Sequence, residues 1–158
     1  MTTTVIEPEL VFEIETPLKL GESLYWAAEE KALYFVDILA PALFRLDTVS
    51  RALKQWAMPS EIGSFGMGKD GRIAVALRDG VYWFNPKTEA LDLLVRPEPD
   101  RPMNRLNDGK VGPDGCFWVG SMDDRPEKEK TGALYRITYE GQCTRMLDGV
   151  IISNGLAW

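Results

Sequence analysis

The fold is decided by the stretch Lys69-Asp-Gly-Arg-Ile-Ala-Val-Ala-Leu-Arg-Asp-Gly-Val-Tyr-Trp-Phe84. It holds two short segments of apolar and aromatic residues, Arg72–Leu77 and Gly80–Phe84, with an Asp-Gly pair at the start of each. Asp-Gly pairs readily adopt the positive φ that tight hairpin turns require. The stretch therefore predicts two strands, with a turn at Lys69–Gly71 before the first of them.

The same pattern occurs on both sides of this stretch. Before it, two segments flank a turn at Ala40-Pro41, and after it, two more follow the turn Pro113–Gly115. These four predicted strands are Leu33–Asp37, Leu43–Asp47, Cys116–Gly120 and Ala133–Ile137. Because helical periodicity is nearly absent, we expect an all-β protein with less than about 15% helix.

The strands recur with a long period. Leu33, Ile73 and Phe117 stand at or near the start of equivalent strands, at intervals of 40 and 44 residues. A period of about 40–50 residues with about four strands per unit is typical of a β-propeller, whereas a β-sandwich has no reason for such a period. The sequence therefore predicts antiparallel propeller blades over residues 10–158.

The number of units predicts an incomplete ring. The chain has room for roughly three blades, and propellers close with about four to eight. The apolar segment Ile151–Trp158 stands where the first strand of a further blade should run. We therefore interpret residues 1–158 as the N-terminal half of a single propeller domain, whose ring is completed by sequence not present here.

Composition excludes several classes of function. The chain has 158 residues, with 18 Lys and Arg against 24 Asp and Glu, a formal charge of −6. This acid excess argues against nucleic-acid partners and anionic membranes, and it suits cations. With no histidine in the chain, no Ser-His-Asp triad, Cys-His dyad or His-based zinc helix can form.

Cysteine usage and the N-terminus point to a reducing compartment. Cys116 and Cys143 lack the spacing of a zinc site, and we expect both to be free thiols. Met1–Leu10 has no basic and apolar leader pattern, and the longest apolar runs are far too short to span a bilayer. We expect a cytoplasmic protein with no membrane partner.

One set of polar residues shares a repeat phase. Glu22-Ser-Leu-Tyr-Trp26 aligns with Asn154-Gly-Leu-Ala-Trp158, and Asn107-Asp-Gly-Lys-Val111 falls in the same phase, with Phe65–Lys69 in the intermediate unit. Equivalent positions on innermost strands converge on the central channel. One carboxylate and two amides there would form an oxygen-rich site for a hard cation such as Ca²⁺, Mg²⁺ or Mn²⁺. The alternative is that each is an ordinary turn residue.

Two further features lie close to these residues in the sequence. Arg105 precedes Asn107 by two positions and is either a surface residue or a donor to an oxygen-rich ligand. The charged run Asp123–Lys130 is most simply a solvated loop, although Asp123 or Asp124 could touch a ligand because they follow a strand at the channel mouth. The five tryptophans, which recur with the strands, are expected in the blade cores.

The chain resembles the family of the senescence marker protein (regucalcin), gluconolactonase and the luciferin-regenerating enzyme. The similarity runs over residues about 18–158. The stretches that carry it are Leu20–Trp26, Leu33–Ile38, Arg105-Leu-Asn-Asp-Gly-Lys110, Phe117–Met122, Gly132–Arg136 and Ile152-Ser-Asn-Gly-Leu-Ala-Trp158. The resemblance implies a six-bladed β-propeller, of which this chain covers about the first half.

The resemblance also implies roles for individual residues. Glu22 and Asn154 would be metal ligands, and Arg105, Asn107 and Asp123 would contact substrate. A third ligand, an aspartate that also serves as general base, is expected beyond residue 158. Four positions depart from the family: Arg125 stands where some members have a glutamate, Ser23 replaces a commoner glycine, and Gly112 and Cys116 also differ from the common choices.

The implied activity is metal-dependent hydrolysis of a sugar lactone or a similar cyclic ester. One divalent cation (Ca, Zn, Mg or Mn) would be the cofactor, and a small-molecule sugar lactone the partner. This chemistry needs no histidine. Two alternatives stay open, a non-catalytic calcium-binding regulatory propeller and a scaffold that uses only its outer surface. The sequence leaves the oligomeric state open.

Overall fold

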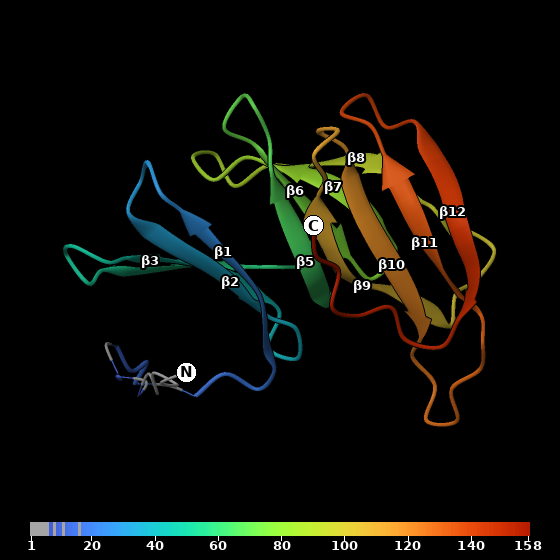
Figure 1. Ribbon diagram of the computed structural model, residues 1–158, viewed down its shortest axis with the longest axis horizontal. Helices are drawn as coiled ribbons and strands as arrows, with labels where there is room; N and C mark the ends of the chain where they lie inside the picture. The colour runs from blue at the N-terminus through green and yellow to red at the C-terminus, as the bar shows by residue number, and fades with distance from the viewer. Residues whose placement is uncertain (1–6, 8, 11, 16) are drawn as a thin grey trace, which may run out of the picture.

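The computed structural model describes residues 7, 9, 10, 12–15 and 17–158, and its regular elements are all β-strands (Figure 1). The twelve strands are β1 (Gly21–Ala27), β2 (Ala32–Asp37), β3 (Ala42–Asp47), β4 (Leu53–Ala57), β5 (Ile62–Met67), β6 (Ile73–Leu77), β7 (Gly80–Phe84), β8 (Leu91–Val95), β9 (Asn104–Val111), β10 (Phe117–Asp123), β11 (Gly132–Ile137) and β12 (Cys143–Val150). Within the described residues, no helix could cross a membrane.

The strands form three four-stranded sheets in chain order: β1–β4, β5–β8 and β9–β12. Neighbouring strands of each sheet pair antiparallel, so each sheet is a simple meander. The prediction of three blades in an all-β protein is confirmed. The stretch Met1–Leu10, where the sequence predicts no leader, lies largely outside the described residues, because 1–6 and 8 are among those left out.

The predicted turns carry the backbone conformation that their residues favour. Gly71 has φ of 82° and Gly115 has φ of 74°, both in the left-handed region that glycine adopts without steric cost. Gly71 lies just before β6, and Gly115 lies just before β10. The two Asp-Gly turns therefore set where these strands begin.

Apolar side chains join the sheets face to face. One core cluster lies between the first and second sheets and includes the fully buried Val36, Leu43 and Ile62. A second cluster lies between the second and third sheets and includes Val81 and Val119. This packing brings β5 alongside both β1 and β9, so the three innermost strands line one axis (Figure 1).

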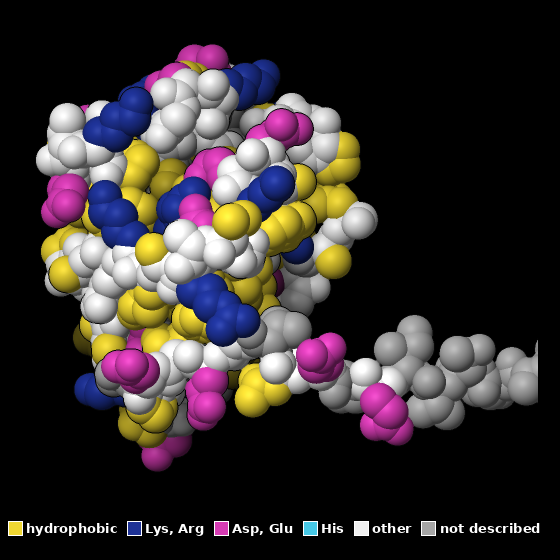
Figure 2. Space-filling view, turned by 90° about the vertical axis from the view of Figure 1, so that its left-hand side faces the viewer, with side chains coloured by type: hydrophobic (Ala, Val, Ile, Leu, Met, Phe, Trp, Pro, Cys, Tyr) yellow, Lys and Arg dark blue, Asp and Glu magenta, His cyan; other side chains and the backbone are white. Residues whose placement is uncertain are grey.

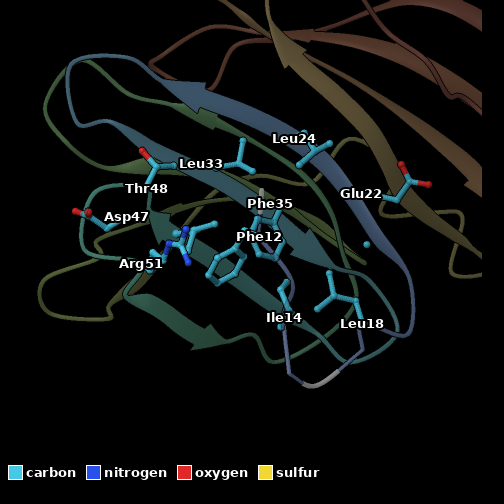
Figure 3. Close-up of a pocket in the computed structure, with 12 residues that line it drawn as sticks. Phe12, Ile14, Leu18, Glu22, Leu24, Leu33, Phe35, Asp47, Thr48 and Arg51 are labelled. Carbon is cyan, nitrogen blue, oxygen red and sulfur yellow. The ribbon is translucent and has the colours of Figure 1, made fainter. Parts of the chain in front are cut away.

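A third apolar cluster covers the other face of the first sheet. Phe35 and Phe44 stack there with ring centroids 5.1 Å apart, and Phe12 and Ile14 pack against them. Figure 2 views the molecule from this side, where hydrophobic side chains reach the surface between scattered charged ones. The cluster borders an apolar cavity of about 550 Å³, drawn in Figure 3.

For two of the five tryptophans, the expectation that they are buried in the blade cores is wrong. Trp56 and Trp83 are buried, but Trp26 is 51% exposed and Trp158 is 59% exposed. Side chains alternate between the two faces of a strand. Because Tyr25 contacts Phe65 of the second sheet, Trp26 points to the opposite, open face.

The strand expected over Ile151–Trp158 does not form. The segment makes one isolated bridge, Ile152 to Met122, and otherwise crosses the edge of the third sheet. Its backbone is held by side chains instead of by a paired strand: Asn107 binds the carbonyl of Ser153, and Asp108 binds the amide of Leu156. Both cysteines are free as predicted, with Cys116 buried and Cys143 exposed.

Candidate functional site

Four of the five predicted site residues line a small cavity at one end of the innermost strands. Its volume is about 170 Å³, and it is lined from β1, from β5, from β9 and from the C-terminal segment. Glu22, Arg105, Asn107 and Asn154 all line it. The topology thus brings together side chains that are far apart in the sequence, as their repeat phase predicts.

Glu22 and Asn154 stand in matching backbone settings. Ser23 has φ of 55° and Gly155 has φ of 73°, so each site residue directly precedes a left-handed residue. The pairing of β1 with β2 also shifts register between Glu22 and Tyr25, which is the signature of a bulge. Bulges and left-handed residues re-aim neighbouring side chains; a left-handed residue follows both Glu22 and Asn154, and the register shift adjoins Glu22.

The carboxylate of Glu22 is free to take a ligand. It is exposed and makes no hydrogen bond or ion pair with any residue that the structure describes. Glu22 also borders the apolar cavity on that face, although in Figure 3 its carboxylate points away from Phe12 and Phe35. Glu22 therefore presents an unpaired carboxylate at a cavity that Asn154 also lines.

Two hydrogen bonds from β9 place Asn154. The Nδ2 atom of Asn107 donates to the carbonyl of Ser153 at 2.7 Å, and the backbone amide of Leu156 donates to Oδ2 of Asp108 at 2.6 Å. These bonds anchor the chain on both sides of Asn154. Its position depends on contacts with β9, although it lies outside any regular strand.

Arg105 is buried and its guanidinium is held on two edges. Nε donates to Asp124 at 3.0 Å, and Nη1 donates to the carbonyl of Leu106 at 3.1 Å and to Oδ1 of Asn107 at 2.7 Å. Nη2 has no partner among the described residues. Because Trp56 Nε1 is the sole fully buried side-chain N or O left unpaired in that part of the chain, Nη2 is not fully buried, and Arg105 is one of the residues that line the cavity.

Asp123 lies apart from this group. Its side chain is fully buried and takes hydrogen bonds from the Arg125 guanidinium and from the backbone amides of Arg125 and Glu129. These contacts, with the Arg125 guanidinium foremost, hold the pKa of Asp123 well below its usual range. Asp123 does not line the cavity, and its side-chain hydrogen bonds stay within the loop that follows β10. The next residue, Asp124, is the one that faces Arg105.

Sequence reasoning missed two charged residues behind Arg105. Arg78, in the turn between β6 and β7, donates to Glu61 from Nε at 2.9 Å and from Nη2 at 3.0 Å, and it also pairs with Asp124. The hydrogen bond from Arg78 lowers the pKa of Glu61 to about 2. In the sequence, both residues look like ordinary turn residues.

The phase of the intermediate repeat also needs correction. Gly63, and not Phe65, lines the cavity in the position equivalent to Glu22 and Asn154. The pairing of β5 with β6 shifts register between Ile62 and Ser64, next to this position, and the predicted start of the intermediate unit at Phe65 lies two residues too late. Phe65 instead belongs to the core between the first two sheets.

Gly63 allows β5 to approach β9, and we expect Gly63→Ala to destabilise the protein. A Cβ atom at Gly63 would lie 2.6 Å from the carbonyl oxygen of Asn107 and 2.8 Å from that of Leu106. Both contacts are to backbone, which cannot give way as a flexible side chain does. The free energy of unfolding should fall by about 2–3 kcal/mol, as measured by urea denaturation.

Gly71→Ala is the matched control for this substitution. Gly71 has φ of 82° and nothing within 4 Å of the added Cβ, so alanine brings only backbone strain, about 1–2 kcal/mol. Gly63→Ala should also broaden or shift the NMR signals of Asn107, which Gly71→Ala should leave in place. Unchanged Asn107 signals in Gly63→Ala would contradict the close approach.

The cavity has two chemical halves. Glu22 and Asn154 offer side-chain oxygens, whereas Arg105 Nη2 and the second N–H of Asn107 offer hydrogen-bond donors. An all-oxygen ligand set suits a hard divalent cation, and the unpaired carboxylate of Glu22 fits such an ion. In the described residues, no group of three or more Asp, Glu, His or Cys could hold a metal.

Known proteins with similar sequences include a lactonase and a regucalcin. The sequence profile of the SMP-30/Gluconolactonase/LRE-like region matches residues 20–158. The 6-deoxy-6-sulfogluconolactonase of Pseudomonas putida is 35% identical over 145 residues, covering 92% of this chain and 50% of that protein. Regucalcin of Xenopus laevis is 33% identical over 144 residues, covering 89% of this chain and 48% of that protein.

A solved structure supports the fold. Regucalcin of Agrobacterium tumefaciens, described as a calcium-binding protein, is similar with a TM-score of 0.78 at 28% identity, over 86% of this chain and 45% of that one. The chain therefore spans about half the length of the relatives it matches.

Proposed function

We propose that this chain, which belongs to the SMP-30/gluconolactonase/LRE-like family, carries half of the active site of a metal-dependent sugar lactonase. The observation that carries the proposal is the cavity shared by Glu22, Asn154, Arg105 and Asn107. The 35% identity to a sulfogluconolactonase supports lactone chemistry. The remaining cation ligand and the general base would come from residues beyond 158.

The residues divide the work in this proposal. Glu22 and Asn154 would hold the cation. The chemistry that a bound divalent cation supplies is Lewis-acid polarisation of a carbonyl oxygen. Arg105 and Asn107 would orient the lactone by donating hydrogen bonds to its oxygens, and donors aimed at the carbonyl oxygen stabilise the negative charge that develops there during hydrolysis.

A lactone-hydrolysis assay on the full-length protein tests this function. We expect turnover of a sugar lactone that is lost with a chelator and restored when a divalent cation is added back. A second candidate is cation binding without turnover, which the likeness to a calcium-binding regucalcin favours. Cation binding measured by calorimetry in the absence of any lactone hydrolysis would support this second function.

Arg105→Ala should separate substrate binding from cation binding. Arginine cannot ligate a cation, so cation affinity should change less than about twofold, whereas loss of a charged hydrogen-bond donor should lower kcat/KM by about 10–100-fold. Arg96→Ala, which removes an exposed arginine paired with Asp79, is the control. An equal loss of cation affinity in Arg105→Ala would contradict the assignment.

A further inference from the structure

Four charged side chains of alternating sign form a continuous chain beside the cavity. Glu61 pairs with Arg78, Arg78 with Asp124, and Asp124 with Arg105. Glu61 and Arg78 belong to the second sheet, in the segments next to β5 and β6, whereas Asp124 and Arg105 belong to the third. The chain therefore crosses the junction between two sheets and ends at the residue that faces the cavity.

Asp124 is the central member of this chain. Its Oδ1 accepts from Arg105 Nε at 3.0 Å, and its Oδ2 accepts from Nη2 of Arg78. Its own backbone amide donates to the carbonyl of Met103 at 3.0 Å, which ties the residue to the chain just before β9. The Asp124 carboxylate is thus held from two directions.

The contacts of Arg105 fix the orientation of its guanidinium. This group is planar and rigid, so fixing Nε through Asp124 and Nη1 through Leu106 and Asn107 also fixes Nη2. Nη2 is the atom without a partner in the described part of the chain. The Asp124 bond is the sole ion pair among these contacts, and without it Arg105 would keep only the bonds at Nη1.

We propose that Asp124 is a positioning residue, which together with the Glu61–Arg78 pair holds Arg105 so that Nη2 is aimed into the cavity. Asp124 touches no ligand in this assignment and acts only through Arg105. The inference rests on the proposed function for the role of Arg105 toward substrate. The geometry of the four side chains does not depend on that function.

The test is a double-mutant cycle in the full-length protein. Asp124→Asn keeps the shape and removes the charge, and we expect it to lower kcat/KM for lactone hydrolysis by about tenfold or more, since small misplacements of orienting groups have effects of that size. In an Arg105→Ala background, the same substitution should change kcat/KM by less than about twofold, because residues that act as a unit are not additive. An equal factor in both backgrounds would overturn the proposal.

Two further variants bracket the effect. Glu61 is linked to Arg105 only through Arg78 and Asp124. Glu61→Gln should therefore lower kcat/KM less than Asp124→Asn does, by about two- to threefold. Asp79→Asn is the matched control, because Asp79 adjoins Arg78 in the sequence but pairs with the exposed Arg96. It should leave kcat/KM unchanged.

A second readout needs no activity, so it separates this inference from the proposed function. In wild-type protein the Arg105 Nε–H should give a resolved NMR signal protected from solvent exchange. Asp124→Ala, which removes both acceptor oxygens, should abolish that protection, and Asp79→Ala should keep it. Protection that survives Asp124→Ala would overturn the positioning role, whereas the absence of lactone turnover in the wild type would overturn only the proposed function.

Discussion

Replacing Glu98 by alanine should lower the free energy of unfolding by about 3–5 kcal/mol. The Glu98 side chain is 7% exposed and accepts three short hydrogen bonds inside the third sheet. Its Oε1 accepts from Ser121 Oγ at 2.9 Å and from the Tyr135 hydroxyl at 2.8 Å, and its Oε2 accepts from Asn104 Nδ2 at 2.8 Å. A buried donor without an acceptor costs about 1–3 kcal/mol, and alanine deprives three donors at once.

Urea denaturation of the variants would measure this effect. Glu98→Gln keeps one oxygen but cannot accept at its nitrogen, so we expect a smaller loss of about 1–2 kcal/mol. Glu29→Ala, at an exposed turn position before β2, is the control and should change stability by less than about 0.5 kcal/mol. A Glu98→Ala protein as stable as this control would show that the three bonds contribute nothing.

Replacing Glu22 by glutamine should weaken binding of the divalent cation more than any other single change at the cavity. The substitution preserves shape and removes the unpaired carboxylate, and cation affinity in oxygen sites rises with ligand charge. We expect more than a tenfold loss of affinity by calorimetry on the full-length protein. Lactone turnover at limiting cation should fall with it.

Asn154→Asp is the complementary variant, because it adds a charge at the second proposed ligand. It should weaken cation binding less than Glu22→Gln does. Glu29→Gln is the control, because it removes a carboxylate that lies away from the cavity. Wild-type cation affinity in Glu22→Gln would contradict the assignment of Glu22 as a ligand. Wild-type affinity in Asn154→Ala would remove Asn154 from the coordination shell.

Much of the architecture follows from local sequence. The Asp-Gly turns at Gly71 and Gly115 adopt the predicted positive φ, and β7 has the predicted bounds Gly80–Phe84. Hydrophobic alternation and turn residues act over a few neighbouring positions, so a short stretch contains all the information they need. The repeat period then placed Glu22 and Asn154 at one cavity, because equivalent strands of successive blades meet at one axis.

Register at the ends of strands could not be obtained in this way. Asp123 and Asp124 are adjacent, and a shift of one residue moves a side chain to the opposite face of a strand. The structure places Asp123 inside its own loop and Asp124 against Arg105. Likewise, the irregular pairing near Ile62 gives the channel position to Gly63 instead of Phe65.

The sequence by itself determined the all-β class, the three-blade repeat and the set of residues whose phase brings them together. Only the tertiary structure decided which side chains support that set. Arg78, paired with Glu61, reaches Asp124 across the junction of two sheets, and Asp108 anchors the segment that carries Asn154. Such contacts depend on how separately folded sheets pack against one another, and no pattern of neighbouring residues in the sequence records that packing.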